Sequence, residues 1–248
     1  MLEPPVKKEN ISKVVGIMSG KGGVGKSSVT ALAAVTLARK GLKVGILDAD
    51  ITGPSMPRMF GLKGRLATDD DRIVPALTRK LGIELVSLNL LMDEEGDPVI
   101  WRGPILAGVV MQFWNDVNWG RLDYLLIDMP PGTGDIPLSL MQSVPLDGLV
   151  MVTTPQGLAK LIVSKSVRMA ETMNVPILGT VQNMSYIKCP CCDTEIKPFG
   201  DGGEASTLPQ PLIRLPIDPK LTELADSGDI EMAESAELAA IADMIQSA

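Results

Sequence analysis

The chain has 248 residues, of which 45% are apolar and 21% are charged, so its size and composition are those of a folded globular protein. Three cysteines are too few for a disulfide-stapled scaffold, and the absence of histidine excludes imidazole general bases and His-containing metal sites. With 30 acidic and 23 basic side chains the formal net charge is -7, which provides no broad cationic surface. We therefore expect neither nucleic acid nor a membrane as a partner.

The N-terminal residues bear on domain organisation and on compartment. Residues 1–10 are charged and contain prolines, so they predict a flexible N-terminal arm ahead of a single domain over residues 11–248. The arm has no apolar signal segment, and no apolar run approaches the roughly 18 residues that a membrane helix requires. We expect a cytoplasmic protein whose thiols are reduced.

Apolar runs typical of strands alternate along the chain with longer stretches typical of helices. This alternation predicts a parallel sheet covered by helices on both faces. The expected strands are Val14–Met18, Lys43–Leu47, Glu84–Leu88, Tyr124–Ile127, Leu149–Thr153 and Ile177–Gln182. The expected helices are Lys26–Arg39, Ile105–Val117, Ile136–Ser143, Leu158–Met173 and the acidic C-terminal stretch from Pro219.

A glycine-rich loop follows the first predicted strand. Residues 19–28 read Ser-Gly-Lys-Gly-Gly-Val-Gly-Lys-Ser-Ser and fit the pattern G-x-x-x-x-G-K-[ST], a cradle for phosphates at the start of a helix. Lys26 is expected to reach the β- and γ-phosphates of ATP, and the Ser27 hydroxyl to bind Mg²⁺. The motif in this setting predicts an α/β, three-layer P-loop NTPase fold with a mostly parallel central sheet flanked by helices. The predicted ATP-binding residues of the loop are Gly20, Lys21, Gly22, Gly23, Val24, Gly25, Lys26, Ser27 and Ser28.

Carboxylates stand at the ends of two further predicted strands, where ligands of open α/β sheets bind. Asp128 ends one apolar strand and is expected to orient Mg²⁺, although an aspartate at a strand end also often caps a turn. Asp48 and Asp50 follow another strand, and the two-residue period of a strand predicts that both carboxylates face the same side. We expect Asp48 to serve the Mg²⁺ shell and Asp50 to position the attacking water. Since a carboxylate in that role accelerates hydrolysis modestly, a slow, Mg-dependent ATPase is expected.

All three cysteines lie in one short loop. Cys189 and Cys192 form a C-x-x-C pair with Cys191 between them, a pattern compatible with a redox dithiol, half of a zinc site or half of an iron–sulfur site. A metal or cubane cluster needs four ligands, and one chain offers three clustered thiols and no histidine. Two such loops at the twofold axis of a homodimer would supply four thiolates from Cys189 and Cys192. Zinc could occupy the same site in purified protein.

The motifs together resemble the Mrp/ApbC branch of cluster-carrier P-loop ATPases, which is related to the Nbp and Ind proteins. The resemblance covers residues 14–218 and rests on the motifs Gly20–Ser27, Asp48–Ser55, Trp101–Pro104, Asp128–Asp135, Thr153–Gln156, Asn183–Tyr186 and Cys189–Cys192.

The resemblance implies roles for individual residues. In the wider class, a second lysine in the phosphate loop reaches across a dimer interface to the partner's nucleotide, which implies a catalytic role for Lys21 beside Lys26. It also implies that Asp50 positions water, that Asn183 contacts adenine and that Pro216 forms an apolar wall beside it.

The resemblance further implies a function. It is that of an ATP-dependent iron–sulfur carrier, with a labile 4Fe–4S cluster held between subunits by Cys189 and Cys192 and transferred to apo-proteins. Cys191 departs from the family pattern and adds a third possible ligand. Two alternatives remain: a Min- or Par-like spatial organiser, and an ATPase with a structural zinc at the dimer interface. The organiser needs a basic tail, whereas residues 224–248 contain no lysine or arginine.

Overall fold

The computed structural model describes residues 8–50, 55–70, 72–87, 90, 108, 112–156, 159–200 and 208–248. Predicted features that fall elsewhere, including residues 1–7, 51–54 and 101–104, lie outside the described part of the chain. Within it, no helix is both long enough and apolar enough to cross a lipid bilayer.

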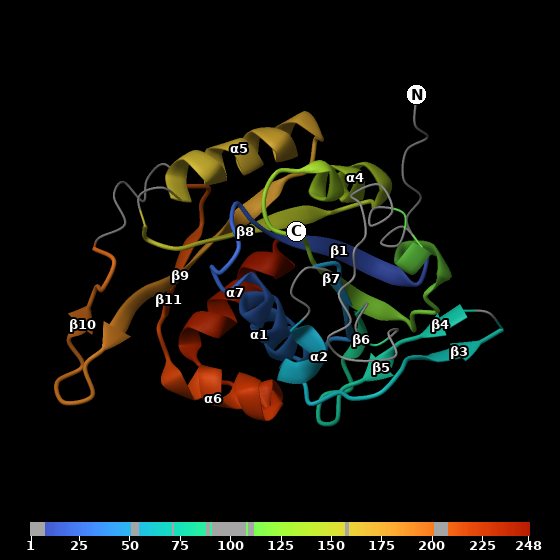
Figure 1. Cartoon of the computed structure of the whole chain (residues 1–248), viewed down its shortest axis with the longest axis horizontal. Coiled ribbons are helices and arrows are strands. Elements are labelled where there is room, and N and C mark those ends of the chain that lie inside the picture. The colour runs from blue at the N-terminus through green and yellow to red at the C-terminus, as the bar shows by residue number, and fades with distance from the viewer. Residues whose placement is uncertain are drawn as a thin grey trace.

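A large, mostly parallel sheet forms the middle layer (Figure 1). Its strand order is β10-β9-β8-β1-β7-β2-β6-β5, with β11 paired to β9, and only the pairs β5–β6 and β9–β10 are antiparallel within the described residues. The strands are β1 (Ile11–Ser19), β2 (Val44–Asp48), β5 (Ala76–Leu77), β6 (Glu84–Ser87), β7 (Leu122–Asp128), β8 (Gly148–Thr153), β9 (Ile177–Lys188), β10 (Glu195–Ile196) and β11 (Leu212–Pro216). A separate hairpin pairs β3 (Ala67–Asp69) with β4 (Arg72–Val74).

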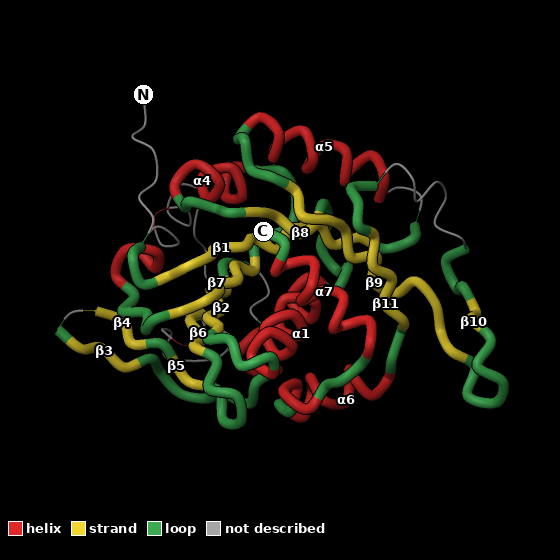
Figure 2. Tube along the Cα trace, turned by 180° about the vertical axis from the view of Figure 1, so that it is seen from behind, coloured by secondary structure: helices red, strands yellow, loops and turns green. Residues whose placement is uncertain are grey.

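Helices cover both faces of this sheet, as Figures 1 and 2 show from opposite sides. On one face lie α4 (Asp135–Ser143) and α5 (Ala159–Thr172). On the other lie α1 (Lys26–Arg39), α2 (Met56–Met59), α6 (Pro219–Ser227) and α7 (Ala236–Gln246), with the 3-10 turn η3 (Ile230–Met232) between the last two. The predicted three-layer α/β architecture is therefore confirmed.

Burial explains why the central strands read as continuous apolar runs. Every residue of β2 and β8 is buried, because each strand has a neighbour on both sides and helices above and below. Helix α1 is largely buried as well, because it packs on the sheet and has α7, α2 and η3 beside it. The carboxyl ends of β1, β2 and β7 consequently meet at one edge of a rigid core.

Several expectations differ from the structure in detail. The strand expected over Ile177–Gln182 continues to Lys188, so the segment after Gln182 is not yet a loop. The acidic C-terminal stretch forms two helices rather than one, because Gly228 adopts a left-handed conformation and ends α6. Of the helix expected over Ile105–Val117, the described residues 108 and 112–116 are helical.

Residues 8–10, at the end of the predicted arm, contact the body of the protein. Lys8 Nζ donates to the carbonyl oxygens of Asn115 and Val117, and Asn10 Nδ2 donates to that of Trp119. The Lys8 ammonium also lies 5.6 Å from the centre of the Trp114 ring. Burial lowers the pKa of Lys8, with a smaller contribution from nearby Arg72. These contacts hold the chain immediately before β1 against residues 114–119.

The buried carboxylate of Glu231 ties η3 to the turn before β6. Its oxygens accept hydrogen bonds from Thr78 Oγ1 at 2.7 Å, from the Leu81 amide at 2.8 Å and from the Lys80 amide at 3.1 Å. Glu231 is 5% exposed, so water cannot replace these bonds. The carboxylate therefore fixes the turn against the C-terminal region.

Replacing Glu231 by alanine is expected to lower the free energy of unfolding by about 3 kcal/mol, because three donors lose their buried acceptor. For a chain of this size the melting temperature should fall by roughly 6–12 °C. Glu234→Ala is the matched control, since Glu234 is 79% exposed and pairs only at the surface with Arg39. Thermal unfolding followed by circular dichroism measures both, and equal shifts in the two variants would contradict the assignment.

Candidate functional site

The predicted phosphate loop connects β1 to α1 at the carboxyl edge of the sheet. Gly23 and Gly25 have φ angles of 77° and 80°, a left-handed conformation that favours glycine. Gly25 is the residue that precedes α1, so the amide groups of the first helical turn are directed into the loop. A Cβ atom at Gly25 would lie 2.3 Å from Asn183 Nδ2, so this position has no room for a side chain.

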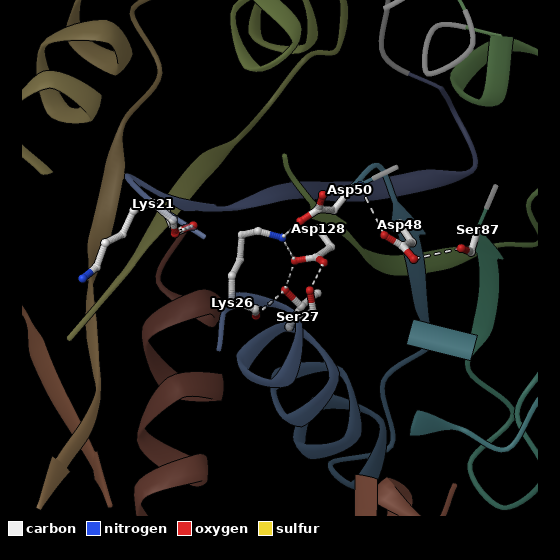
Figure 3. Close-up of polar contacts among 9 residues, drawn as sticks. Lys21, Lys26, Ser27, Asp48, Asp50, Ser87 and Asp128 are labelled. Carbon is white, nitrogen blue, oxygen red and sulfur yellow. Dashed lines mark hydrogen bonds and ion pairs between the residues drawn. The ribbon is translucent and has the colours of Figure 1, made fainter. Parts of the chain in front are cut away.

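The carboxylate of Asp128 collects three donors from α1 (Figure 3). Lys26 Nζ lies 2.8 Å from Oδ1, Ser27 Oγ lies 2.6 Å from Oδ2, and Thr30 Oγ1 lies 2.9 Å from Oδ1. Asp50 Oδ2 lies 3.2 Å from the same Lys26 ammonium. The structure thus brings together the predicted residues Lys26, Ser27, Asp50 and Asp128, which come from three separate segments.

Oxygen atoms from Ser27 and Asp128 converge in this cluster. A hydroxyl and a carboxylate are the hard ligands that Mg²⁺ prefers, and their separation of 2.6 Å allows both to face one ion. These two residues therefore fit the predicted metal site. The cation that balances them in this structure is the ammonium of Lys26, which is 5% exposed.

Burial acts on both strand-end aspartates. Asp48 and Asp128 lie opposite each other in the register of β2 and β7, and both are almost completely buried. Burial, and then the charge of Asp128, raises the pKa of Asp48 to about 8. Burial also raises the pKa of Asp128, against the opposing effect of Lys26 and its hydrogen bonds.

The two carboxylates of the Asp48-Ala-Asp50 motif do not face the same way, contrary to the sequence-based expectation. Asp48 Oδ2 lies 2.8 Å from Ser87 Oγ at the end of β6, whereas Asp50 faces Lys26 (Figure 3). Strand β2 ends at Asp48, so the alternation of a strand does not extend to Asp50. Asp48 Oδ1 instead accepts a hydrogen bond from the Asp50 amide, at 3.2 Å.

Replacing Asp48 by asparagine is expected to stabilise the nucleotide-free protein progressively as the pH rises. Below about pH 4 both the folded and the unfolded states hold the proton of Asp48. Between about pH 4 and pH 8 the unfolded state releases it while the folded state retains it, so the wild-type protein loses up to about 1.4 kcal/mol per pH unit relative to the variant. Denaturant unfolding across this range measures the difference, with the surface variant Asp243→Asn as control. A pH-independent difference would contradict the prediction.

Two adjoining cavities lie beside the loop. One, of about 320 Å³, is lined by the phosphate loop, Asp50 and Pro131. The other, of about 440 Å³, is lined by Asn183, Pro216 and side chains of α1, α2 and α6. Both cavities are lined by Gly25 and Ser28, so they adjoin at the start of α1. Together they have the size for a nucleotide, with the phosphates beside the loop and the nucleobase beside Asn183 and Pro216.

The larger cavity is lined by Asn183 and Pro216, the two residues that the resemblance assigns to the adenine base. Asn183 Nδ2 donates to the Val24 carbonyl oxygen at 2.9 Å, which fixes the amide against the phosphate loop. Its Oδ1 accepts from the amide of Met184, whose φ angle is 56°. The amide side chain is therefore held in place by the backbone.

Lys21 is turned away from the catalytic cluster. Its ammonium lies 2.7 Å from Gln156 Oε1 and points away from Lys26 (Figure 3). Within a single chain, Lys21 therefore does not contribute to the group formed by Lys26, Asp50 and Asp128.

The cysteines occupy the tip of a hairpin at the opposite end of the molecule from β3 and β4 (Figure 1). The hairpin joins β9 to β10, and its turn is closed by hydrogen bonds of 3.0 Å between Cys189 and Thr194 and between Asp193 and Cys189. Cys191 and Cys192 are exposed and Cys189 is half-buried. Hydrogen bonds between Cys192 and Thr194, and then between Cys192 and Cys189, lower the pKa of the Cys192 thiol.

Three contacts at the site were not predicted from the sequence. Thr30 lies one helical turn after Lys26, a spacing that could have indicated its shared partner. Ser87 faces Asp48 only because β6 pairs with β2, which requires the strand order. Gln156 belongs to a motif of the family resemblance, but nothing in the sequence indicated its contact with Lys21.

Comparisons with known proteins identify the family of this chain. Residues 10–248 match a family model described as NUBPL iron-transfer P-loop NTPase. An iron-sulfur cluster carrier protein from Clostridium perfringens is 51% identical over 90% of this chain and 82% of its own length. A cytosolic Fe-S cluster assembly factor from Kluyveromyces lactis is 42% identical over 91% of this chain and 84% of its own length.

A solved structure is similar over nearly the whole chain. It is a nucleotide-binding protein from Archaeoglobus fulgidus in complex with ADP, with a TM-score of 0.82 and 45% identity, covering 92% of this chain and 91% of that one. The family resemblance inferred from the motifs and the predicted fold are thus confirmed. The chain belongs to the family of NUBPL iron-transfer P-loop NTPases.

Proposed function

We propose that this protein is an ATP-dependent iron–sulfur cluster carrier, which hydrolyses Mg-ATP slowly and transfers a labile 4Fe–4S cluster to apo-proteins. The observation that carries the proposal is that one strand connects the larger cavity, which we call the base cavity because we assign it to the nucleobase, with the cysteine loop. Asn183 lies on β9, and Cys189 follows the end of the same strand directly. The geometry of the site supports each part of the proposal in turn.

The cavity beside the phosphate loop is suited to the phosphates of ATP. The amides of the loop and the positive end of α1 face the phosphates, and Lys26 lies where the β- and γ-phosphates arrive. Ser27 and Asp128 would hold Mg²⁺, whose charge stabilises the negative charge that develops during phosphoryl transfer. When nucleotide and metal enter, Lys26 exchanges its contacts with Asp128 and Asp50 for contacts with phosphate.

Asp50 is the residue we assign to the attacking water. It lines the phosphate cavity, its side chain is 13% exposed, and its Oδ2 lies near the ammonium that faces the γ-phosphate. Asp48 accepts a hydrogen bond from Ser87 and lies opposite Asp128 in the register of β2 and β7, so we assign it to the surroundings of the Mg²⁺ site rather than to direct contact with substrate. Hydrolysis in which a carboxylate positions the attacking water is expected to be slow.

Two copies of the chain would complete the machinery. In a homodimer, Lys21 would leave Gln156 and reach the partner's nucleotide, adding positive charge near the γ-phosphate as an arginine finger does. The exposed cysteine hairpins would meet at the twofold axis, where four thiolates from Cys189 and Cys192 could hold one cluster. A zinc ion could take the same four ligands in purified protein.

The class of recipient follows from the class of cargo. Apo-proteins with open cysteine ligands are the acceptors that a labile cluster requires, and a cytosolic relative is named as an assembly factor for such clusters. We propose a cytoplasmic setting for this protein on the same basis.

Anaerobic loading with iron and sulfide tests the shared cluster. Wild-type protein is expected to bind about four iron atoms per dimer and to show a broad absorption band near ~400 nm that disappears on transfer to an apo-ferredoxin. Cys189→Ser and Cys192→Ser should each retain little iron, because two of the four ligands per cluster are lost.

Cys191→Ser is the matched control and should load like the wild-type protein. Wild-type iron content in both Cys189→Ser and Cys192→Ser, or a cluster carried by a strictly monomeric protein, would overturn the shared site. Binding of zinc alone, without any iron loading, would favour the structural-zinc alternative.

A further inference from the structure

Five side chains fasten the base of the cysteine hairpin to the rest of the protein. We call them the hairpin clamp, and they come from four elements: β9, β10, β11 and α7. The members are Tyr186, Lys188, Glu195, Arg214 and Glu237.

The clamp contains two links between the hairpin and its neighbours. On one side, Glu237 Oε1 accepts a hydrogen bond from Tyr186 Oη at 3.2 Å and pairs with Lys188 Nζ at 3.4 Å. On the other side, Arg214 Nη2 pairs with Glu195 Oε2 at 3.7 Å, and its guanidinium carbon lies 5.3 Å from the centre of the Tyr186 ring. Tyr186 therefore stands between the two links.

Burial distinguishes the centre of the clamp from its edges. Tyr186 is 5% exposed, whereas the side chains of Arg214 and Glu195 are 39% and 43% exposed. Exposed ion pairs contribute little to stability by themselves. The ladder of β9 with β10 is also short, joining Lys188 to Glu195 and Ile187 to Ile196. The direction of the hairpin therefore depends on the clamp as well as on the ladder.

The clamp also touches the cavity assigned to the base. The Ile217 amide donates to the Tyr186 carbonyl oxygen at 2.7 Å, and Pro216 lies opposite Tyr186 in the register of β11 and β9. Pro216 and Ile217 both line the cavity, as does Asn183, three residues before Tyr186 on β9. Tyr186 thus contacts the wall of the cavity through its backbone and the other clamp residues through its side chain.

We propose that the hairpin clamp, centred on Tyr186, couples occupancy of the base cavity to the position of the cysteine loop. The clamp residues are positioning residues, since they contact neither nucleotide nor cargo. The inference rests on the proposed function for the identity of the two ligands, a nucleotide and an iron–sulfur cluster. The coupling itself concerns only the cavity and the thiols of this chain.

The coupling has a direct physical route. A base seated between Asn183 and Pro216 sets the separation of β9 and β11 at the register shift that lies between Arg214 and Pro216. Arg214 then carries the displacement to Glu195 on the hairpin, and Tyr186 carries it to Glu237 on α7. Because binding free energies are reciprocal, a ligand held by the thiols must change nucleotide affinity by the same factor.

Thiol reactivity of the metal-free, reduced protein tests the coupling. The rate at which an aromatic disulfide reagent modifies the cysteines is measured at fixed pH, with and without saturating ADP, and ADP affinity is measured by calorimetry. In the wild-type protein we expect ADP to change the rate about fivefold or more. We call the modification rate with ADP divided by the rate without ADP the ADP ratio. In Arg214→Met and Glu237→Gln this ratio should lie within about twofold of one, while the Kd for ADP changes less than about threefold.

Asp243→Asn is the matched control, because Asp243 also lies on α7 and pairs with Lys40, away from the hairpin. It removes the same charge from the same helix and should keep the wild-type ratio. Tyr186→Phe keeps the ring beneath Arg214 and removes only the hydroxyl, so it should give an intermediate ratio. Circular dichroism establishes that each variant is folded.

Three results would overturn the coupling: a wild-type ratio retained in both Arg214→Met and Glu237→Gln, no response of wild-type thiols to ADP, or equal loss in Asp243→Asn. Failure of the proposed function is recognised separately. If wild-type protein retains no iron under anaerobic loading, the carrier function is wrong, and the response of the thiols to ADP still decides the coupling.

Discussion

Replacing Lys26 by methionine is expected to lower the rate of ATP hydrolysis about 100- to 1,000-fold. Lys26 is buried, and its ammonium lies 2.8 Å from Asp128 and 3.2 Å from Asp50, beside the cavity that the phosphate loop lines. Methionine retains most of the length of the side chain and removes the charge, so the phosphates lose a preorganised cation while the packing of α1 is kept. Phosphate release at saturating Mg-ATP measures the effect.

The same substitution should also destabilise the nucleotide-free protein. Without Lys26, the carboxylate of Asp128 keeps its two hydroxyl donors but loses its cation, a change of about 3–5 kcal/mol for a buried pair. Because burial raises the pKa of Asp128, protonation should relieve part of this loss as the pH falls. Lys13→Met is the control, since Lys13 is more exposed and pairs with Asp147 at 3.8 Å. Unchanged hydrolysis in Lys26→Met would refute the assignment.

Replacing Lys21 by alanine should lower hydrolysis about 1,000-fold or more, if it acts as a cation supplied by the partner subunit. Within one chain Lys21 is half-buried and makes an exposed hydrogen bond to Gln156, so its removal should leave folding and ADP affinity almost unchanged. A loss of rate without a loss of stability or of ADP binding separates Lys21 from Lys26, whose removal affects all three.

Mixing the two inactive variants tests whether Lys21 acts across the interface. In a mixed dimer of Lys21→Ala and Lys26→Met subunits, one of the two sites combines an intact Lys26 with an intact Lys21 from the other subunit. Random exchange in an equal mixture should therefore restore about a quarter of the wild-type rate. If Lys21 acted within its own subunit, no mixture would recover activity.

The interior of the fold was predictable because its strands are buried on both faces. The runs at residues 14–18, 124–127 and 149–153 are apolar at nearly every position, and each lies within a central strand of the sheet. The edges were not predictable in the same way. Strands β5 and β10 have two residues each, too few for any periodicity, and β11 depends on pairing with β9. Their positions are set by tertiary contacts.

The site divides along a similar line. The phosphate loop could be recognised because its glycines and Lys26 have a fixed spacing, and Asp128 because an apolar strand precedes it. The orientation of Asp48 could not, since it depends on Ser87 from a strand that is distant in sequence. The position of Asn183 within a strand was also missed, because the polar residues after Gln182 read as a loop. In the structure β8 pairs with β9 only as far as Gln182, whereas the pairing of β11 with β9 continues to Tyr186.

The length of β9 between Asn183 and Cys189 places a strict limit on sequence change. Successive residues of a strand point to opposite faces, so one inserted residue would turn every following side chain over and direct the thiols toward the wrong side. Two inserted residues would restore the facing but move the thiols by about 7 Å along the strand. Insertions and deletions in this short segment should therefore be excluded among relatives that still perform the same task, even where individual side chains vary.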